Sequence, residues 1–178
     1  MRLFPHPGWH SLARCRAETM MAGAGEGMVM KDQGTAGDEL WKVVEAATRL
    51  FNATDNRDWS RVRDCFDESV LFDMSSVSGK EPAWVTPEFI ISGWQEGLKD
   101  LSAVHHQIGN IIVEILGRTA SLTCYGIAIH YLPNPTGRNT RTFVGSYDIR
   151  LIRKKGGWKI SGFAYDSKFV LGNLDLGS

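Results

Sequence analysis

The spacing of apolar residues changes once along this chain, and that change limits the folds it can adopt. Between residues 38 and 98 apolar side chains recur every three or four positions, which is the spacing of an amphipathic helix. From about residue 103 onward they recur at every second position, which is the spacing of a half-buried strand. Helices therefore come first and strands follow, so the order predicts an α+β domain with an antiparallel sheet.

Three helices are expected in the first half. Asp38 is a candidate cap for the first helix, Asp58 for a second in DWSRVRDCF, and Thr86 before Pro87 for a third. A strand at 69–74 separates the second helix from the third. The predicted apolar side of the first helix comprises Trp41, Val44, Ala47 and Phe51, and that of the third comprises Phe89, Ile90, Trp94 and Leu98.

Four long strands are expected in the second half, at 103–116, 119–132, 140–153 and 157–168. The segments LGR, NPTGRN and KKGG lie between them and contain the residues that turns favour. Residues 1–37 differ, because they carry MAGAGEGM, scattered arginines and no sustained period. We predict a disordered N-terminal extension over 1–37 and one domain over 38–178.

Composition excludes several classes of protein. Lys+Arg and Asp+Glu both number 20, so the net charge is zero and the basic excess of a nucleic-acid binder is missing. No apolar run reaches the roughly 18 residues of a membrane span, so no membrane partner is expected. The three cysteines are an odd number without a CxxC pair, which favours free thiols in a reducing compartment and predicts a cytoplasmic location.

The inner faces of two strands suggest a pocket. Along 119–132 one face carries small or apolar side chains and then ends in His130. Small side chains on the concave side of a sheet would leave space for a ligand. The same face of the next strand is apolar except for the hydroxyl of Tyr147.

Two further residues of interest are a histidine and an aspartate. Adjacent residues of a strand point to opposite faces, so only one of His105 and His106 can point inward. The alternation does not decide between them, because each histidine shares its parity with apolar residues further along the strand. A bulge at Gly109 would reconcile the two alternations. His106 also shares its parity with Asn110, which suits a half-polar pocket wall. Asp55 ends the apolar stripe of the first helix, where a charge is costly unless a histidine pairs with it.

These residues admit other interpretations. A histidine on an apolar face is often a core residue with its hydrogen bonds satisfied. His106, His130 and Asp55 could also be metal ligands, but they lack close ligand spacing, so no metal is expected. No GxSxG motif for a nucleophilic serine is present.

Several segments resemble the scytalone dehydratase branch of the SnoaL-like, nuclear-transport-factor-2-like superfamily. ATDNRDWSRVR (53–63) is similar to the segment with that family's active-site aspartate, which falls on Asp55. VHHQIGN (104–110) is similar to the segment of the catalytic base, which falls on His106, and the second histidine falls on His130. GGWKISGF and YDSKF resemble the last strand and the C-terminal segment, so the resemblance covers about 40–175.

The resemblance implies a cone-shaped, curved sheet with three N-terminal helices around one pocket, and no cofactor. This sequence departs from the family's pattern at three positions. The family's two tyrosines fall on Thr54 and Met74, and its pocket asparagine falls near Tyr147. Trp94 and Phe169 complete the expected substrate contacts. Phe169, Val170, Leu171 and Leu174 are expected to form a lid after the last strand.

The resulting hypothesis is a dehydratase for a small β-hydroxy carbonyl compound of polyketide-like or aromatic type. His106 would remove the α-proton, and His130, oriented by Asp55, would protonate the departing hydroxyl. Tyr147 would hydrogen-bond the developing enolate. The alternatives are an isomerase or cyclase of the same fold, or a non-catalytic binding or association domain. The expected partners are a small hydrophobic carbonyl ligand and further copies of the chain, in a dimer or trimer.

Overall fold

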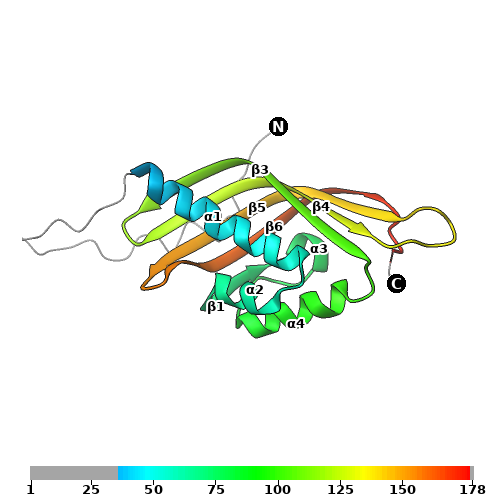
Figure 1. The fold of residues 1–178 in the computed structure, drawn as a ribbon, viewed down its shortest axis with the longest axis horizontal. Helices are drawn as coiled ribbons and strands as arrows, with labels where there is room; N and C mark the ends of the chain where they lie inside the picture. The colour runs from blue at the N-terminus through cyan, green and yellow to red at the C-terminus, as the bar shows by residue number, and fades with distance from the viewer. Residues whose placement is uncertain (1–35, 177–178) are drawn as a thin grey trace, which may run out of the picture. The chain divides into compact units, whose positions relative to one another are not determined.

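The computed structural model describes residues 36–176 (Figure 1). The predicted disordered extension lies outside the described residues except for Ala36 and Gly37, which already belong to the first helix. That helix therefore begins two residues before the expected cap at Asp38.

Four helices are present in this part of the chain, one more than predicted. They are α1 (Ala36–Asp55), α2 (Trp59–Cys65), α3 (Ser75–Ser78) and α4 (Pro87–Leu98). Asp58 caps α2 by accepting a hydrogen bond from the backbone N–H of Arg61, and Thr86 caps α4 by accepting from that of Phe89, as the sequence predicted. The single turn α3 has no apolar period, so nothing in the sequence indicated it.

The buried side of α1 differs from the predicted one by a rotation about the helix axis. Val43, Ala47, Leu50 and Phe51 are buried, whereas Trp41 is 67% exposed. Phe89 on α4 is also exposed, at 65%. Both aromatic residues fit the helical period but lie at the edge of the apolar stripe, where the period alone does not decide burial.

Six strands form one sheet in the order β2-β1-β6-β5-β4-β3. Their bounds are β1 Phe66–Asp73, β2 Ala83–Val85, β3 Ala103–Leu116, β4 Thr119–Tyr131, β5 Thr140–Lys154 and β6 Gly157–Gly172. All neighbours are antiparallel except β1 and β6, which are parallel. Residues 74–156 separate these two strands, so no hairpin turn forces them to run in opposite directions.

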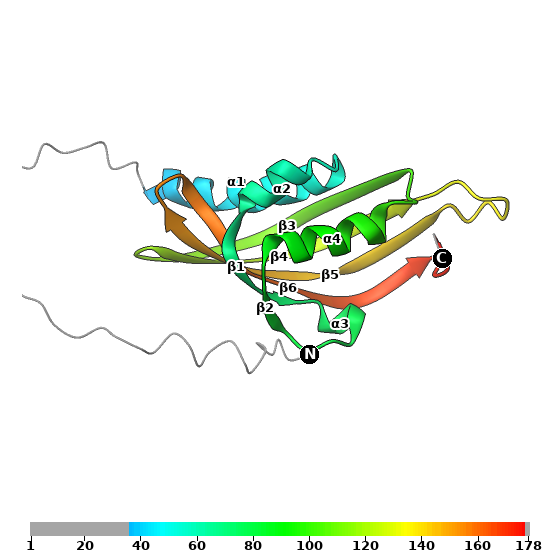
Figure 2. The same cartoon turned by 90° about the horizontal axis from the view of Figure 1, so that it is seen from below.

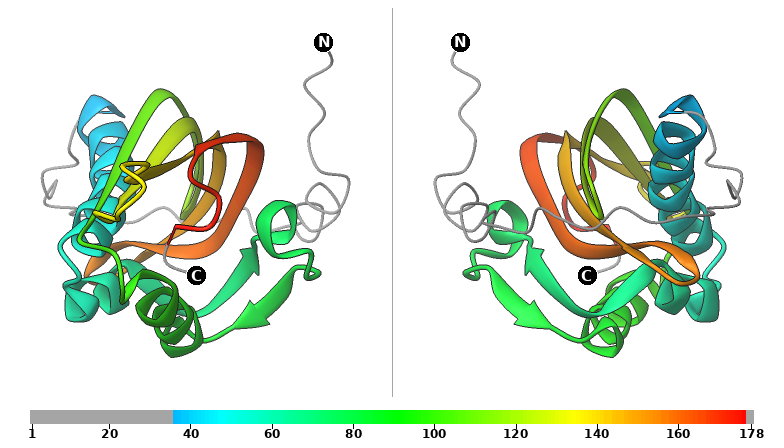
Figure 3. Two further views of the ribbon diagram at one scale, coloured as in Figure 1. Left: turned by 90° about the vertical axis from the view of Figure 1, so that its right-hand side faces the viewer. Right: turned by 90° about the vertical axis from the view of Figure 1, so that its left-hand side faces the viewer.

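The sheet curves, and its concave side faces α1, α2 and α4 (Figures 2 and 3). Helix α1 packs on β3, β4 and β6, and α4 packs on β1. Alternate residues of β4 are buried, from Ala120 to Ala128, which confirms the predicted inner face. The core contains Phe51 from α1, Leu122 from β4, and Tyr147 and Ile149 from β5. None of the described helices is long and apolar enough to cross a membrane.

A bulge in β3 resolves the uncertainty over the two histidines. Gly109 lies opposite Tyr125 and Ile112 lies opposite Thr123, so β3 has one extra residue between these pairs. Asn110, at φ 54, lies in that interval. The extra residue reverses the parity, so His106 and Ile108 face inward before the bulge and Val113 and Ile115 face inward after it.

Candidate active site

Asp55 and His106 form a closely bonded pair on the concave side of the sheet. Asp55 is the last residue of α1, and its Oδ1 lies 2.6 Å from Nδ1 of His106 on β3. The backbone N–H of His106 donates to Oδ2 of the same carboxylate at 2.8 Å. Each side chain is only 14% exposed. One histidine therefore occupies both carboxylate oxygens.

This pairing differs from our expectation that Asp55 would orient His130. The last turn of α1 lies against β3, so the carboxylate reaches the nearest inward histidine of that strand. His105 points outward and is 67% exposed, and its Nδ1 is 4.0 Å from Oδ2 of Asp55. His106 is thus the residue that the carboxylate positions.

The hydrogen bonds of His106 assign its tautomer. A carboxylate accepts, so Nδ1 carries the proton that it shares with Asp55. The other ring nitrogen, Nε2, then has a free lone pair and can accept a proton. This arrangement is that of a carboxylate-oriented general base.

His130 lies on the same face but has a different partner. Its Nδ1 is 3.4 Å from Nη2 of Arg141 on β5, the residue directly opposite it in the sheet. A guanidinium only donates, so Nδ1 accepts and the ring proton of His130 sits on Nε2. Burial is the largest cause that lowers the pKa of His130, to about 4, followed by the positive charge of Arg141. His130 is therefore neutral near pH 7.

Tyr147 fills space that the pattern of small residues predicted to be open. Its ring centroid lies 4.8 Å from those of Phe51 and Tyr165. A Cβ added to Gly126 would lie 2.1 Å from Cε2 of Tyr147, and one added to Gly145 would lie 2.7 Å from Cε2 of Tyr165. The small residues thus accommodate aromatic rings, so the prediction that the small face of 119–132 leaves an open pocket was wrong at Gly126. Burial raises the pKa of Tyr147, so its phenol stays protonated.

Three of the predicted substrate-binding residues either lie away from the site or already form a hydrogen bond within the protein. Thr54 is buried, but its hydroxyl donates to the carbonyl of Leu50 at 2.9 Å, as a helical threonine often does. Asn110 is exposed at the β3 bulge and does not line the concave face. Phe169 is 51% exposed and belongs to β6, opposite Val144.

The expected lid is also corrected. Strand β6 continues to Gly172, so Phe169, Val170 and Leu171 pair with β5 instead of folding over a pocket. Leu174 is 64% exposed. Phe169, Val170 and Leu171 form a continuous apolar run that a strand accommodates, and no Gly or Pro separates this run from Lys168.

Met74 and Trp94 contribute to the core beside the site. Both are half-buried and pack against the main hydrophobic cluster. The ring centroid of Trp94 lies 5.8 Å from that of Phe163, and Phe163 in turn is 5.5 Å from Tyr147. They support the aromatic layer around Tyr147.

Sequence reasoning missed Arg141. It follows the NPTGRN turn, where basic residues are usually solvated, so the local sequence did not indicate a role in the site. Its face of the strand could nevertheless be predicted, because Arg141 shares its parity with Phe143, Gly145 and Tyr147. Counting back along β5 would have placed it on the inner face opposite His130.

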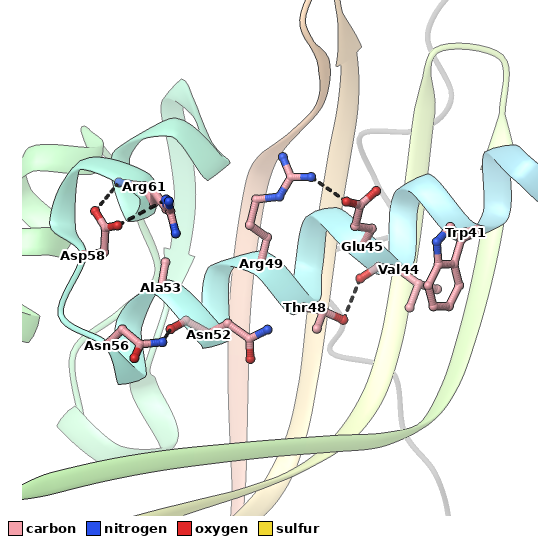
Figure 4. Close-up of a pocket in the computed structure, with 10 residues that line it drawn as sticks. All are labelled: Trp41, Val44, Glu45, Thr48, Arg49, Asn52, Ala53, Asn56, Asp58 and Arg61. Carbon is pink, nitrogen blue, oxygen red and sulfur yellow. Dashed lines mark hydrogen bonds and ion pairs between the residues drawn. The ribbon is translucent and has the colours of Figure 1, made fainter.

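The described residues also bear on two other kinds of site, a metal centre and a surface hollow. No group of three or more His, Cys, Asp or Glu side chains within residues 36–176 could hold a metal ion. A hollow of about 350 Å³ runs along α1, lined by residues such as Trp41, Glu45 and Arg49 (Figure 4). Asp55, His106 and His130 are not among the residues that line it, so it is separate from the candidate site.

Residues 35–164 match the family model of the SnoaL-like domain, and the chain therefore belongs to the SnoaL-like family, within the nuclear-transport-factor-2-like superfamily. Comparison with curated proteins gave no match.

Solved structures share the fold. A candidate aromatic ring hydroxylase from Novosphingobium aromaticivorans is 26% identical, with a TM-score of 0.68 over 80% of this chain and 98% of that one. A candidate scytalone dehydratase from the same organism is 13% identical, with a TM-score of 0.67 over 76% and 88%. A hexachlorocyclohexane dehydrochlorinase is 14% identical, with a TM-score of 0.62 over 79% and 95%. At such low identity the last two demonstrate similarity of fold alone.

Proposed function

We propose that this protein is a cofactor-free dehydratase that removes water from a small β-hydroxy carbonyl compound. The observation that carries the proposal is the Asp55–His106 pair. Its carboxylate holds Nδ1 of the imidazole at 2.6 Å and leaves Nε2 as the proton acceptor. Removal of a proton next to a carbonyl needs such a base.

The reaction follows from that arrangement. Nε2 of His106 takes a proton from the α-carbon, and the electron pair of the broken C–H bond forms an enolate. The enolate electrons form the C=C bond as the C–O bond at the β-carbon breaks. The leaving hydroxyl takes the proton back from the His106 imidazolium and departs as water. The Asp55 carboxylate stabilises the imidazolium while it exists.

His130 receives a different role from the one expected. With its pKa lowered to about 4, it is seldom an imidazolium near neutral pH and is a poor source of a proton for the hydroxyl. Its Nε2–H is instead suited to donate a hydrogen bond to the substrate carbonyl, as a neutral imidazole does in other enolising sites. The phenol of Tyr147 is a second candidate donor.

Two structures that share the fold carry names that describe an elimination. One is a candidate scytalone dehydratase and another a dehydrochlorinase, and both names describe loss of a proton and a leaving group from one substrate. An isomerase or cyclase would begin with the same enolate. A non-catalytic association domain would not require a carboxylate that holds one histidine by both its ring and its backbone N–H.

The base is tested by following deuterium uptake at C3 of 4-hydroxy-4-phenylbutan-2-one, the α-carbon next to the hydroxyl-bearing carbon, in D₂O by NMR, together with loss of water by absorbance. We expect His106→Ala to lose exchange and elimination while its thermal midpoint falls by no more than about 5 °C. His105→Ala, one residue away and exposed, is the matched control and should remain active. Exchange by His106→Ala at the wild-type rate would overturn the proposal.

A further inference from the structure

Arg141 is directed toward the site, although it follows a surface turn. It lies directly opposite His130 and on the same face of β5 as the buried Tyr147. The carbon of its guanidinium is 5.3 Å from the centroid of the Phe143 ring. The charged group is thus held between an aromatic ring and an imidazole on the concave side of the sheet.

The hydrogen bonds of this guanidinium are incomplete. Nη1 donates to the backbone carbonyl of Leu174 at 3.2 Å, and Nη2 lies 3.4 Å from Nδ1 of His130. Nε is buried and has no hydrogen-bond partner. A buried donor without an acceptor is unfavourable, so a ligand oxygen that reached this N–H would offset that cost.

The charge of Arg141 also lacks a counter-ion. Arg49, Arg61 and Arg63 each meet a carboxylate, but no Asp or Glu among residues 36–176 lies within 4.0 Å of the Arg141 guanidinium. Asp55, the carboxylate nearest to the chemistry, is bonded to His106. A half-buried cation without a counter-ion is costly, and an anion bound beside it would offset that cost.

We propose that Arg141 and His130 bind a carboxylate of the substrate, so that the compound dehydrated is a small β-hydroxy acid. This carboxylate is the carbonyl group that the proposed function places against His130. The free Nε–H and an adjacent Nη–H present the two parallel donors that match a carboxylate. A single guanidinium beside a neutral imidazole supplies one positive charge, which suits a monoanionic carboxylate better than a phosphate dianion. This inference rests on the proposed function for the reaction, but carboxylate binding itself does not need His106 to act.

The register places this subsite next to the base. His106 lies opposite Ala128, and His130 is two residues further along β4 on the same face. Such diagonal neighbours are roughly 7–8 Å apart at their Cα atoms. A carboxylate held at His130 and Arg141 would therefore present its adjacent carbon toward His106.

The first test compares equilibrium binding of 3-hydroxy-3-phenylpropanoate and its uncharged amide by calorimetry. We expect the wild-type protein to prefer the acid by at least about tenfold, because charge-assisted hydrogen bonds discriminate by that order. Arg141→Gln should lose the preference, and Arg141→Lys should keep part of it. Arg49→Gln, which removes an exposed arginine of α1, is the matched control. An acid preference that survives in folded Arg141→Gln, or its absence in the wild type, would overturn the proposal.

A second measurement needs no substitution and covers the case in which the Arg141 variants fail to fold. Titration of the wild-type protein with the acid should raise the pKa of the His130 imidazole in NMR spectra, since a bound anion favours the protonated ring. No change at saturation would count against the subsite. His106→Ala should still bind the acid, so failure of the subsite and failure of the proposed catalytic base give different results.

Discussion

Asp55 holds His106 through both of its oxygens, and the two bonds have different consequences. The bond to the backbone N–H fixes where β3 meets the end of α1, and the bond to Nδ1 fixes the tautomer. A neutral amide could preserve the first bond but not the second, because its NH₂ group donates where a carboxylate accepts. A substitution of Asp55 can therefore change the protonation state of the His106 ring without moving the His106 backbone.

Asp55→Asn should keep the fold and lose most of the activity. Its amide would favour the His106 tautomer with the proton on Nε2, which cannot accept the α-proton. A comparable carboxylate-to-amide change lowers the rate by about 10⁴, which is the upper limit expected here. The deuterium-exchange assay measures the loss. Asp58→Asn is the matched control, since asparagine also caps a helix well; an Asp55→Asn rate within about twofold of wild type would contradict the assigned tautomer.

His130 should make the stability of the protein depend on pH. Its pKa is about 4 in the folded protein, against the ordinary value of 6.5. Between these values the unfolded chain binds a proton that the folded chain does not, so the free energy of unfolding should decrease as the pH falls from 6.5 toward 4. Above about pH 7.5 the ring is neutral in both states and contributes no such dependence.

Urea unfolding of wild type and His130→Gln across this range checks the effect. The variant should show a shallower decrease with falling pH, because glutamine does not titrate. His105→Gln controls for removal of an imidazole from an exposed position. Parallel curves for wild type and His130→Gln would show that His130 is not held neutral by its surroundings.

On the inner face of the sheet, glycines of β4 and β5 lie beside large aromatic residues. Gly126 of β4 lies opposite Gly145 of β5, and the rings of Tyr147 and Tyr165 occupy the space beside them. Because each glycine lacks a Cβ, two aromatic rings pack closely against the sheet. This packing, and not an empty space, explains the glycines on the inner face.

Gly126→Ala should be destabilising. The new Cβ would lie 2.1 Å from Cε2 of Tyr147, and that ring has Phe51 and Tyr165 on its other sides. Overpacking of this kind costs about 1–3 kcal/mol. Gly93→Ala is the matched control, because a Cβ there meets nothing within 4 Å on α4 and should stabilise the helix by roughly 0.5–1 kcal/mol. Equal stabilities of Gly126→Ala and wild type in urea would contradict the packing described.

Some of this arrangement is readable from the sequence, and some is not. The inner face of β4 follows from strict alternation, and the capping roles of Asp58 and Thr86 follow from local chemistry. The choice of partner for Asp55 depends on where α1 crosses the sheet, which is set by tertiary packing. The parallel pairing of β1 with β6 likewise depends on segments far apart in the chain, as does the hydrogen bond from Arg141 to the carbonyl of Leu174.

The C-terminal residues connect distant parts of the fold. After β6 ends at Gly172, the N–H of Asn173 donates to the carbonyl of Thr140 at 2.8 Å. The carbonyl of Leu174 accepts from Arg141, and Leu176 is buried against Leu98, Leu101 and Val104. Removal of residues after Lys168 would therefore break strand pairing and this cluster together, so binding and folding should fail together instead of separately.

Leu176→Ala tests this role without removing any strand. Leu176 is 2% exposed, and its cluster joins the end of α4 to the start of β3. Truncation of a buried leucine costs about 2–5 kcal/mol, since it loses apolar burial and leaves a cavity. Leu174→Ala is the matched control, because that side chain is 64% exposed and should change stability by no more than about 0.5 kcal/mol. Thermal or urea unfolding distinguishes them. Destabilisation of Leu176→Ala alone would show that the last turn is a structural part of the domain. Equal losses of stability in the two variants would show that Leu176 does not anchor the C-terminus.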